Sequence, residues 1–430
     1  MISISSIQSR EILDSRGKPT IETLVRLSDD SIGKAAVPSG ASTGSKEAVE
    51  LRDGDQARFM GMGVLKAIDN IDTKIAPILK GLSPFDQIDL DKKLVDLDGT
   101  DNKSNIGANA MLSVSLGICH AAAASMKIPL YKYLSIKDEV TLPVPMFNIL
   151  NGGAHALNST DVQEFLIMPS GLPTFREAMR AGVEIYQALK SLLLARGLNT
   201  NVGDEGGFAP TLDSNRTALE IIVDSIEKAG YTPGTDCYLG LDVAATGLLQ
   251  RGKYYFPRED RLLTSDELIN RYKNWSLEFP LLSIEDGLSE DDWDGWCKMS
   301  REIGSTVQLV GDDIYTTNPN LINKGISLSA SNAVLLKPNQ IGTLTETIEA
   351  FKIARGAGWG TILSHRSGET EDTTIADLSV ALNVGQIKAG APCRSERVAK
   401  YNRLLMIEKE IGNKAIYSGI EAYNHVRGEG

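Results

Sequence analysis

YLGLD at residues 238–242 is the first of six apolar runs that each end in one charged or metal-binding residue. The others read LLSIE (281–285), VQLVGD (307–312), AVLLK (333–337), TILSH (361–365) and VGQIK (384–388). Runs of Val, Ile and Leu with little alternation, followed by helical patterns, are typical of buried parallel strands. We therefore expect a parallel sheet built from strand–helix units.

Two further strand candidates, VPMFNIL (144–150) and VQEFLIMP (162–169), bring the number of expected strands to eight. Eight strands close a barrel, although an irregular one, because two helical stretches (175–196 and 215–229) come before the third strand. The sequence thus predicts the α/β class, with an irregular eight-stranded (β/α) TIM-type barrel. In such a barrel, polar residues at the carboxyl ends of the strands meet in one mouth.

A smaller α+β domain is expected before the barrel. Residues up to about 37 contain two or three strand-like segments, and the pattern is helical from about 48 to 134. NIGANAMLSVSLGICHAAAASM (105–126) is apolar almost all round, as in a buried helix. We predict a capping domain over 1–137 and a catalytic barrel over 138–430, with PSGASTGS (38–45) as a mobile lid loop.

The composition favours an ordinary globular protein that acts on small molecules. The chain has 430 residues and a net charge of −12, which argues against a nucleic-acid or anionic membrane surface. Its four cysteines form no CxxC pair, so we expect a reduced, cytoplasmic protein. Neither a signal peptide nor a stretch of ~18 uninterrupted apolar residues is visible.

Three carboxylates end three of the strand candidates that follow one another: Asp242, Glu285 and Asp312. At ~4 Å, each pair would repel by roughly 4 kcal/mol at an effective dielectric constant of 20, so their convergence calls for a cation. Oxygen ligands suit a hard divalent ion, Mg²⁺ before Zn²⁺ or Cu²⁺. For any one acid alone, capping of the next helix is the simpler interpretation.

Two lysines and an arginine end other strands. Lys337 and Lys388 lie in what we expect to be a cationic, metal-bearing mouth, where a lysine should have a lowered pKa suited to a base. A lone lysine there would more often be an ion-pair partner. His365, Arg366 and Ser367 end the seventh strand just before a helical pattern, where barrels tend to hold phosphate.

Further acids lie near a glycine-rich turn and a strand. Glu205 lies in VGDEGG (202–207), whose glycines permit close approach to a ligand, although an ordinary turn with incidental acids is the alternative. Gln163 and Glu164 interrupt or end the second barrel strand. An acid inside an apolar strand is paired or functional, and Glu164 and Glu205 could share a proton.

Ten motifs in order, from about Arg10 to Met406, resemble the enolase family. They are PSGASTG (38–44), DGTDNKSNIGANA (98–110), NGGAHA (151–156), VQEF (162–165), GDEGGFAP (203–210), SIEDGL (283–288), VGDD (310–313), NQIGTLTET (339–347), SHRSGETEDT (364–373) and RSERVAKYN (394–402). The resemblance implies a lyase that dehydrates 2-phosphoglycerate to phosphoenolpyruvate in glycolysis and runs in reverse in gluconeogenesis. It also implies two Mg²⁺ ions per site, the second arriving with substrate, and a homo-oligomer, either a dimer or an octamer.

The resemblance also implies a role for each site residue. Asp242, Glu285 and Asp312 look like the ligands of the first Mg²⁺, and Ser42 like the lid residue that ligates the second. Lys337 resembles the base, and Glu205, helped by Glu164, the acid that expels hydroxide. The substrate contacts implied are His155, Gln163, His365, Arg366, Ser367 and Lys388.

Two rival functions are weighed against this one. Another dehydratase or racemase of the same superfamily would act on a different acid, but the phosphate pair Arg366 and Ser367 argues against it. A non-catalytic binding or adhesion protein could retain the enolase fold, since enolase-like proteins are implicated in surface adhesion and RNA-processing assemblies. The presence of every implied catalytic group argues against lost activity.

Overall fold

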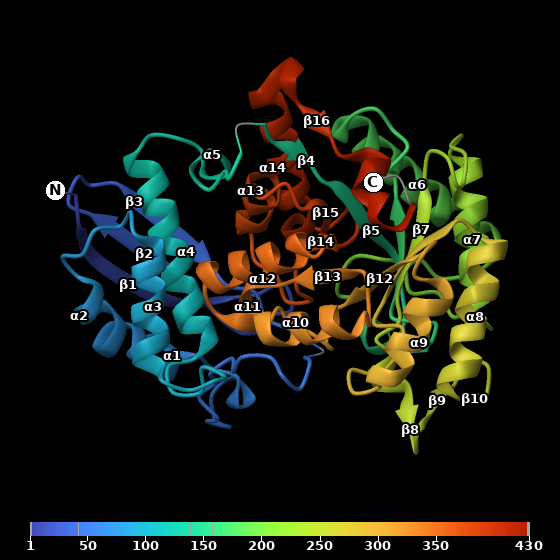
Figure 1. Ribbon diagram of the computed structural model, residues 1–430, viewed down its shortest axis with the longest axis horizontal. Coiled ribbons are helices and arrows are strands. Elements are labelled where there is room, and N and C mark those ends of the chain that lie inside the picture. Colours follow the sequence, from blue (N-terminus) through green and yellow to red (C-terminus); the bar gives the residue numbers. More distant parts are fainter. Residues whose placement is uncertain (1, 42, 138, 157, 428–430) are drawn as a thin grey trace.

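The computed structural model describes residues 2–41, 43–137, 139–156 and 158–427. Its amino-terminal part, blue and cyan in Figure 1, lies beside a larger barrel part coloured green to red. The amino-terminal sheet is antiparallel in the order β1 (Ile4–Leu13), β2 (Pro19–Leu27) and β3 (Ile32–Ala36), as the strand-like segments predict. The predicted domain border at residues 137 and 138 stays a prediction.

The helices of this part begin later than the pattern predicts. They are α1 (Leu65–Asn70), a π-helical turn (Ile71–Ile75), α2 (Ala76–Leu79), α3 (Gln87–Asp98), α4 (Ala108–Ser125) and α5 (Leu130–Tyr133). Residues 48–58 contain no helix, and the expectation of one from about residue 48 is wrong. The following segment turns through Phe59 and Met60, whose left-handed φ values of 48° and 52° are incompatible with a continuous helix.

Helix α4 is the core of the amino-terminal part, as expected for an element that is apolar almost all round. It packs against β2 and β3. Of the described helices, it is the one long and apolar enough to cross a bilayer by length and composition, and 83% of that stretch is buried inside the protein. Burial of this kind is typical of a core helix.

All eight predicted barrel strands form, and they close into one barrel. They are β5 (Val144–Asn151), β6 (Glu164–Met168), β7 (Tyr238–Asp242), β11 (Leu281–Glu285), β12 (Gln308–Gly311), β13 (Ala333–Leu336), β14 (Gly360–Ser364) and β15 (Gly385–Lys388). Their order around the barrel is β11-β12-β13-β14-β15-β5-β6-β7.

Strand β6 runs against both of its neighbours, which the prediction of a parallel sheet missed. It pairs antiparallel with β5 and with β7. The two helices α6 (Phe175–Ala195) and α7 (Asn215–Lys228) explain why this works. A reversed strand ends at the far side from the mouth, so the number of helices before β7 must be even, and α6 and α7 bring the chain up and down again. The loop between α6 and α7 consequently lies at the mouth.

The remaining helices of the barrel part follow β7 in the chain. They are α8 (Ser265–Glu278), α9 (Trp293–Ile303), α10 (Pro319–Leu328), α11 (Pro338–Ile341), α12 (Leu344–Gly356), α13 (Thr374–Ala381), α14 (Ser395–Ile411) and α15 (Asn424–Arg427). Short strands β8 (Leu249–Gln250), β9 (Lys253–Phe256) and β10 (Arg261–Leu263) form a small sheet, and β4 (Thr141–Leu142) pairs with β16 (Ile416–Tyr417).

The two parts touch where α3 and α4 meet α11 and α12 (Figure 1). Buried Asp91 of α3 accepts hydrogen bonds from the backbone and side chain of Thr345, at the start of α12. Lys103 forms an ion pair of 2.8 Å with Glu346. These contacts hold the amino-terminal part, and the loop at 38–45 that it carries, against the barrel.

Candidate active site

One cavity lies at the carboxyl ends of the barrel strands, and most of the predicted site residues line it. Lining it are His155, Gln163, Glu164, Glu205, Asp242, Asp312, Lys337, His365, Arg366, Ser367 and Lys388. Glu285 is buried and contacts the ammonium group of Lys388, 2.8 Å away. Ser42 lies outside the described residues.

The predicted metal ligands share the mouth with two lysines. Asp242 and Glu285 end neighbouring strands in register, and the Nζ atom of Lys388 lies 2.9 and 2.8 Å from their carboxylates. Asp312 forms an ion pair with Lys337. These acids therefore create a field that attracts cations. Among the described residues, Glu285 Oε1 is also buried without a hydrogen-bond partner, and an all-oxygen donor set with a spare oxygen fits a hard divalent ion.

The pKa values of both lysines are raised, in contrast to the expectation of lowered values, because neighbouring carboxylates surround them. Burial lowers the pKa of Lys337, but the carboxylate of Asp312 outweighs burial and raises it. Burial also opposes the charge on Lys388, whose pKa is nevertheless well above its usual range because Asp242, Glu164 and Glu285 surround it. The prediction assumed that a metal would already neutralise these carboxylates.

Asp286, which the sequence analysis did not single out, holds the backbone beside Asp312. Its two carboxylate oxygens accept hydrogen bonds from the backbone N–H groups of Asp312 and Asp313, both at 2.9 Å. It is buried and has a left-handed φ of 42°, a strained conformation of the kind that is found at functional sites. Asp286, Asp312 and Asp313 also have ligand atoms within 4.8 Å of one another.

We expect Asp286→Asn to weaken divalent metal binding by ~10–100-fold, because losses of groups that orient metal ligands have effects of this size. An amide can accept from only one of the two backbone N–H groups, which leaves the other without a partner. Calorimetric titration with Mg²⁺ checks the affinity. The matched control is Asp294→Asn, an exposed acid of α9. Equal affinities for the two variants would remove the orienting role of Asp286.

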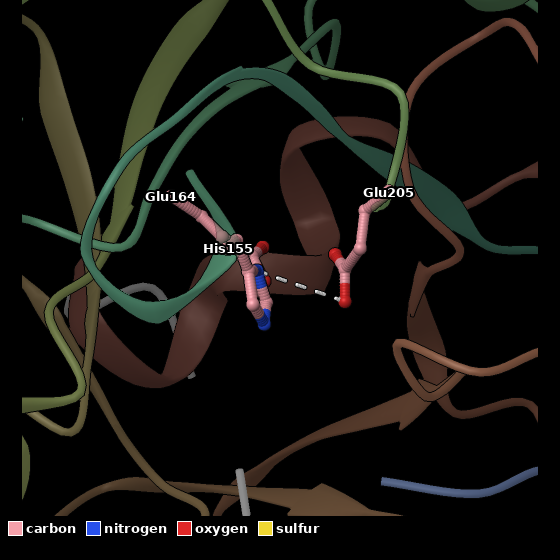
Figure 2. Close-up of side chains that lie close together, drawn as sticks. All are labelled: His155, Glu164 and Glu205. Carbon is pink, nitrogen blue, oxygen red and sulfur yellow. Dashed lines mark ion pairs between the residues drawn. The ribbon is translucent and has the colours of Figure 1, made fainter. Parts of the chain in front are cut away.

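A second group of three lies across the cavity and consists of His155, Glu164 and Glu205 (Figure 2). His155 Nδ1 is 3.3 Å from Glu164 Oε1 and 3.9 Å from Glu205 Oε1. Glu164 begins β6 rather than ending it, and it reaches the mouth because that strand is reversed. In the loop of Glu205, Gly206 has a φ of +90°, and a Cβ there would lie 2.9 Å from the sulfur of Cys393. Glycine is therefore required beside Glu205.

The two glutamates differ in their hold on a proton. Burial raises the pKa of Glu164, and the negative charge of Glu205 raises it further. Burial also raises the pKa of Glu205, but the nearby imidazoles of His365 and His155 and the guanidinium of Arg397 hold it well below the usual range. Burial lowers the pKa of His155, yet these two carboxylates raise it to about 9. Of the two glutamates, Glu164 therefore binds a proton more readily than Glu205.

The predicted phosphate pair already has partners from the amino-terminal part. Arg366 donates to both oxygens of Glu47, at 2.9 and 3.1 Å. Ser367 Oγ accepts the backbone N–H of Ala41 at 3.2 Å. Glu47 also accepts from the backbone N–H of Gly44 at 3.0 Å. The predicted lid loop is thus tied directly to the residues expected to bind phosphate.

Glu47 and Asn148 are two further site residues that sequence reasoning missed. Asn148 Nδ2 donates to Glu205 Oε2 at 3.1 Å from within β5, where a polar residue in an apolar run was the available signal. Glu47 follows the glycine-rich loop by two residues and looks like any surface acid in the sequence. Asp286 directly follows Glu285, the residue that ends the apolar run, so the strand-end pattern does not single it out.

Comparison with known families accounts for nearly the whole chain. A model described as the enolase N-terminal domain matches residues 4–134. A second, described as the enolase C-terminal TIM barrel domain, matches residues 139–426. These domains indicate a lyase of the enolase superfamily with a small-molecule substrate and a divalent metal. The chain therefore belongs to the enolase family.

Proposed function

We propose that the protein is a phosphopyruvate hydratase, a hydro-lyase that reversibly dehydrates 2-phospho-D-glycerate to phosphoenolpyruvate with Mg²⁺. The observation that supports this most is the placement of the proton-transfer groups. Lys337 follows β13 and Glu164 begins β6, and these strands are four places apart in the closed order of eight. Glu164 lies beside Glu205, so a base on one wall and this pair of acids on the other suit removal of a proton and a hydroxide from two sides of one substrate.

Each group of residues has a task in this reaction. Lys337 would take the proton next to the substrate carboxylate, and Glu205, supplied with a proton from the His155 and Glu164 side, would protonate the departing hydroxide. Arg366 and Ser367 would bind the phosphate, and Lys388 would face the carboxylate. His155, Gln163 and His365 would complete the contacts.

The metal ligands proposed are Asp242, Glu285 and Asp312 for a first Mg²⁺ and Ser42 for a second. A bound divalent ion supplies positive charge where negative charge develops in proton removal. Lys388 and Arg366 add cationic groups to this mouth, so a protein with a net charge of −12 can still bind an anion.

We expect the purified protein to form phosphoenolpyruvate from 2-phosphoglycerate in the presence of Mg²⁺ and to lose at least ~100-fold in rate after chelation, because the developing charge then has no cation to meet it. Adding Mg²⁺ back should restore the rate. Absorbance of the enol product measures both. Unchanged turnover after thorough chelation would remove the metal assignment.

The same assay separates the rivals. Turnover of a non-phosphorylated hydroxy acid at a higher rate than 2-phosphoglycerate would favour another lyase of the superfamily. No turnover of either, with the fold intact, would favour a binding or adhesion protein. We place the proposed activity in glycolysis and gluconeogenesis in the cytoplasm, with a dimeric or octameric assembly by analogy with the family.

A further inference from the structure

Arg397 is a buried cation behind the site. It lies on α14, its side chain is 0% exposed, and it does not line the cavity. Its NH1 atom lies 2.6 Å from His365 Nδ1 and 2.5 Å from the carbonyl oxygen of Arg366. Its NH2 atom donates to the carbonyl oxygens of Ser367, at 2.5 Å, and Asp204, at 3.2 Å. One guanidinium thus joins the loop after β14 to the loop that carries Glu205.

The contact with His365 has a chemical consequence. A guanidinium carries only N–H donors and does not lose its charge in proteins, so the Nδ1 atom of His365 must be the acceptor. A neutral imidazole that accepts at Nδ1 carries its proton on Nε2. Arg397 therefore selects one tautomer of His365.

The selected tautomer directs an N–H group at the reacting groups. His365 Nε2 lies 3.1 Å from Glu205 Oε2, and the ring lines the cavity. Within the described residues, this buried Nε2 atom nevertheless makes no hydrogen bond. A buried donor without a hydrogen-bond partner has capacity for a substrate oxygen.

We propose that Arg397 is a positioning residue that fixes His365 as a neutral Nε2–H donor facing Glu205 and the substrate. The effect on turnover rests on the proposed function, whereas the tautomer does not. The backbone leaves little freedom for another arrangement, because Gly390 passes so close that a Cβ there would lie 2.8 Å from Cδ of Arg397 and 3.0 Å from Cε1 of His365.

The charges around His365 agree with a neutral ring. Burial is the main reason that the pKa of His365 is lowered to about 4, and Arg397 lowers it as well, against the opposing effects of Glu205 and Glu369. Lys388 of β15 meets His365 through the backbone, while its ammonium group contacts acids of other strands. Without Arg397, the acids would face the ring with burial alone to oppose protonation.

The experiment is ¹⁵N NMR of the histidine rings in the full chain without substrate. The chain has four histidines, and loss of one signal in His365→Gln assigns the ring. In the wild type we expect a neutral ring protonated at Nε2 from pH 5.5 to pH 8. In Arg397→Met, the proton should distribute over both nitrogens, and the pKa of the ring should be higher than in the wild type, because one of the causes that lower it is removed.

Lys400→Met is the matched control. Lys400 is another buried cation of α14, one turn further along, and its Nζ atom contacts Glu369 Oε2 and the carbonyl oxygen of Thr370, both at 2.7 Å. Its loss should leave the His365 tautomer unchanged. Arg397→Lys keeps the charge in case the methionine variant does not fold, and it should retain the neutral ring but lose part of the tautomer preference. A single Nε2–H tautomer in folded Arg397→Met, or the same change in Lys400→Met, would overturn the proposal.

Turnover gives a separate test. If the proposed function holds, kcat of Arg397→Met should fall by at least ~10-fold at pH 7. The fall should deepen as the pH is lowered, because a charged His365 holds Glu205 in its ionised form. A fall that does not depend on pH would mean a structural role only. A chain that makes no phosphoenolpyruvate would defeat the proposed function and still leave the NMR result to decide the tautomer.

Discussion

Lys337→Ala is expected to abolish both phosphoenolpyruvate formation and exchange of the substrate's alpha proton in D₂O, each by ~10²–10⁴-fold. The reason is position: Lys337 follows β13 on the wall opposite Glu164, and we assign no other group to take this proton. Mass spectrometry of recovered substrate measures exchange separately from product.

Lys337→Arg is the control that separates a base from an ion-pair partner. Lys337 pairs with Asp312, and an arginine retains that positive charge yet does not give up its proton in proteins. We expect the arginine variant to be as inactive as the alanine variant. Normal exchange in Lys337→Arg would reduce Lys337 to a charge partner and end its assignment as the base.

Glu205→Gln is expected to lower product formation by ~10²–10⁴-fold while retaining measurable exchange. The amide cannot supply the proton that hydroxide needs, but it leaves Lys337 and the three strand-end acids in place. An amide oxygen can still accept from Asn148 Nδ2, which lies 3.1 Å from Glu205 Oε2, so the loop should keep its position.

Glu164→Gln provides the contrast. Burial and the charge of Glu205 raise the pKa of Glu164, which favours its protonated form. The neutral amide of glutamine resembles that protonated carboxyl group. We therefore expect a smaller loss of product than in Glu205→Gln. If Glu164→Gln were the more damaging change and Glu205→Gln retained product formation, the two glutamates would have to exchange roles.

The sequence was sufficient for the strands and for most of the site. Apolar runs with one polar end marked six of the eight barrel strands, and the polar ends Asp242, Lys337 and His365 do reach one cavity. This success has a simple cause. A buried strand must be apolar along its length, so a functional group at its end stands out.

The features that could not be predicted from the sequence depend on contacts between distant segments of the chain. The raised pKa of Lys337 follows from Asp312, twenty-five residues earlier, and the pairing of Arg366 with Glu47 crosses from one part of the chain to the other. The reversal of β6 was also hidden, because an apolar run reads the same in either direction. The one sequence signal of an antiparallel β6 was the even number of helices predicted between β6 and β7.

The reversed strand also bears on how the barrel closes during folding. Strands β5 and β6 are neighbours in sequence and pair antiparallel, so they can associate as a hairpin before the rest of the barrel exists. The pairing of β5 with β15, in which Met146 meets Lys388, joins the two ends of the barrel sequence. The entropic cost of closing this long loop exceeds that of the β5–β6 hairpin by roughly 2–3 kcal/mol. Asn148 of β5 and Glu164 of β6 can therefore come together early in folding. Lys388 joins the site only when β15, the last strand, pairs with β5.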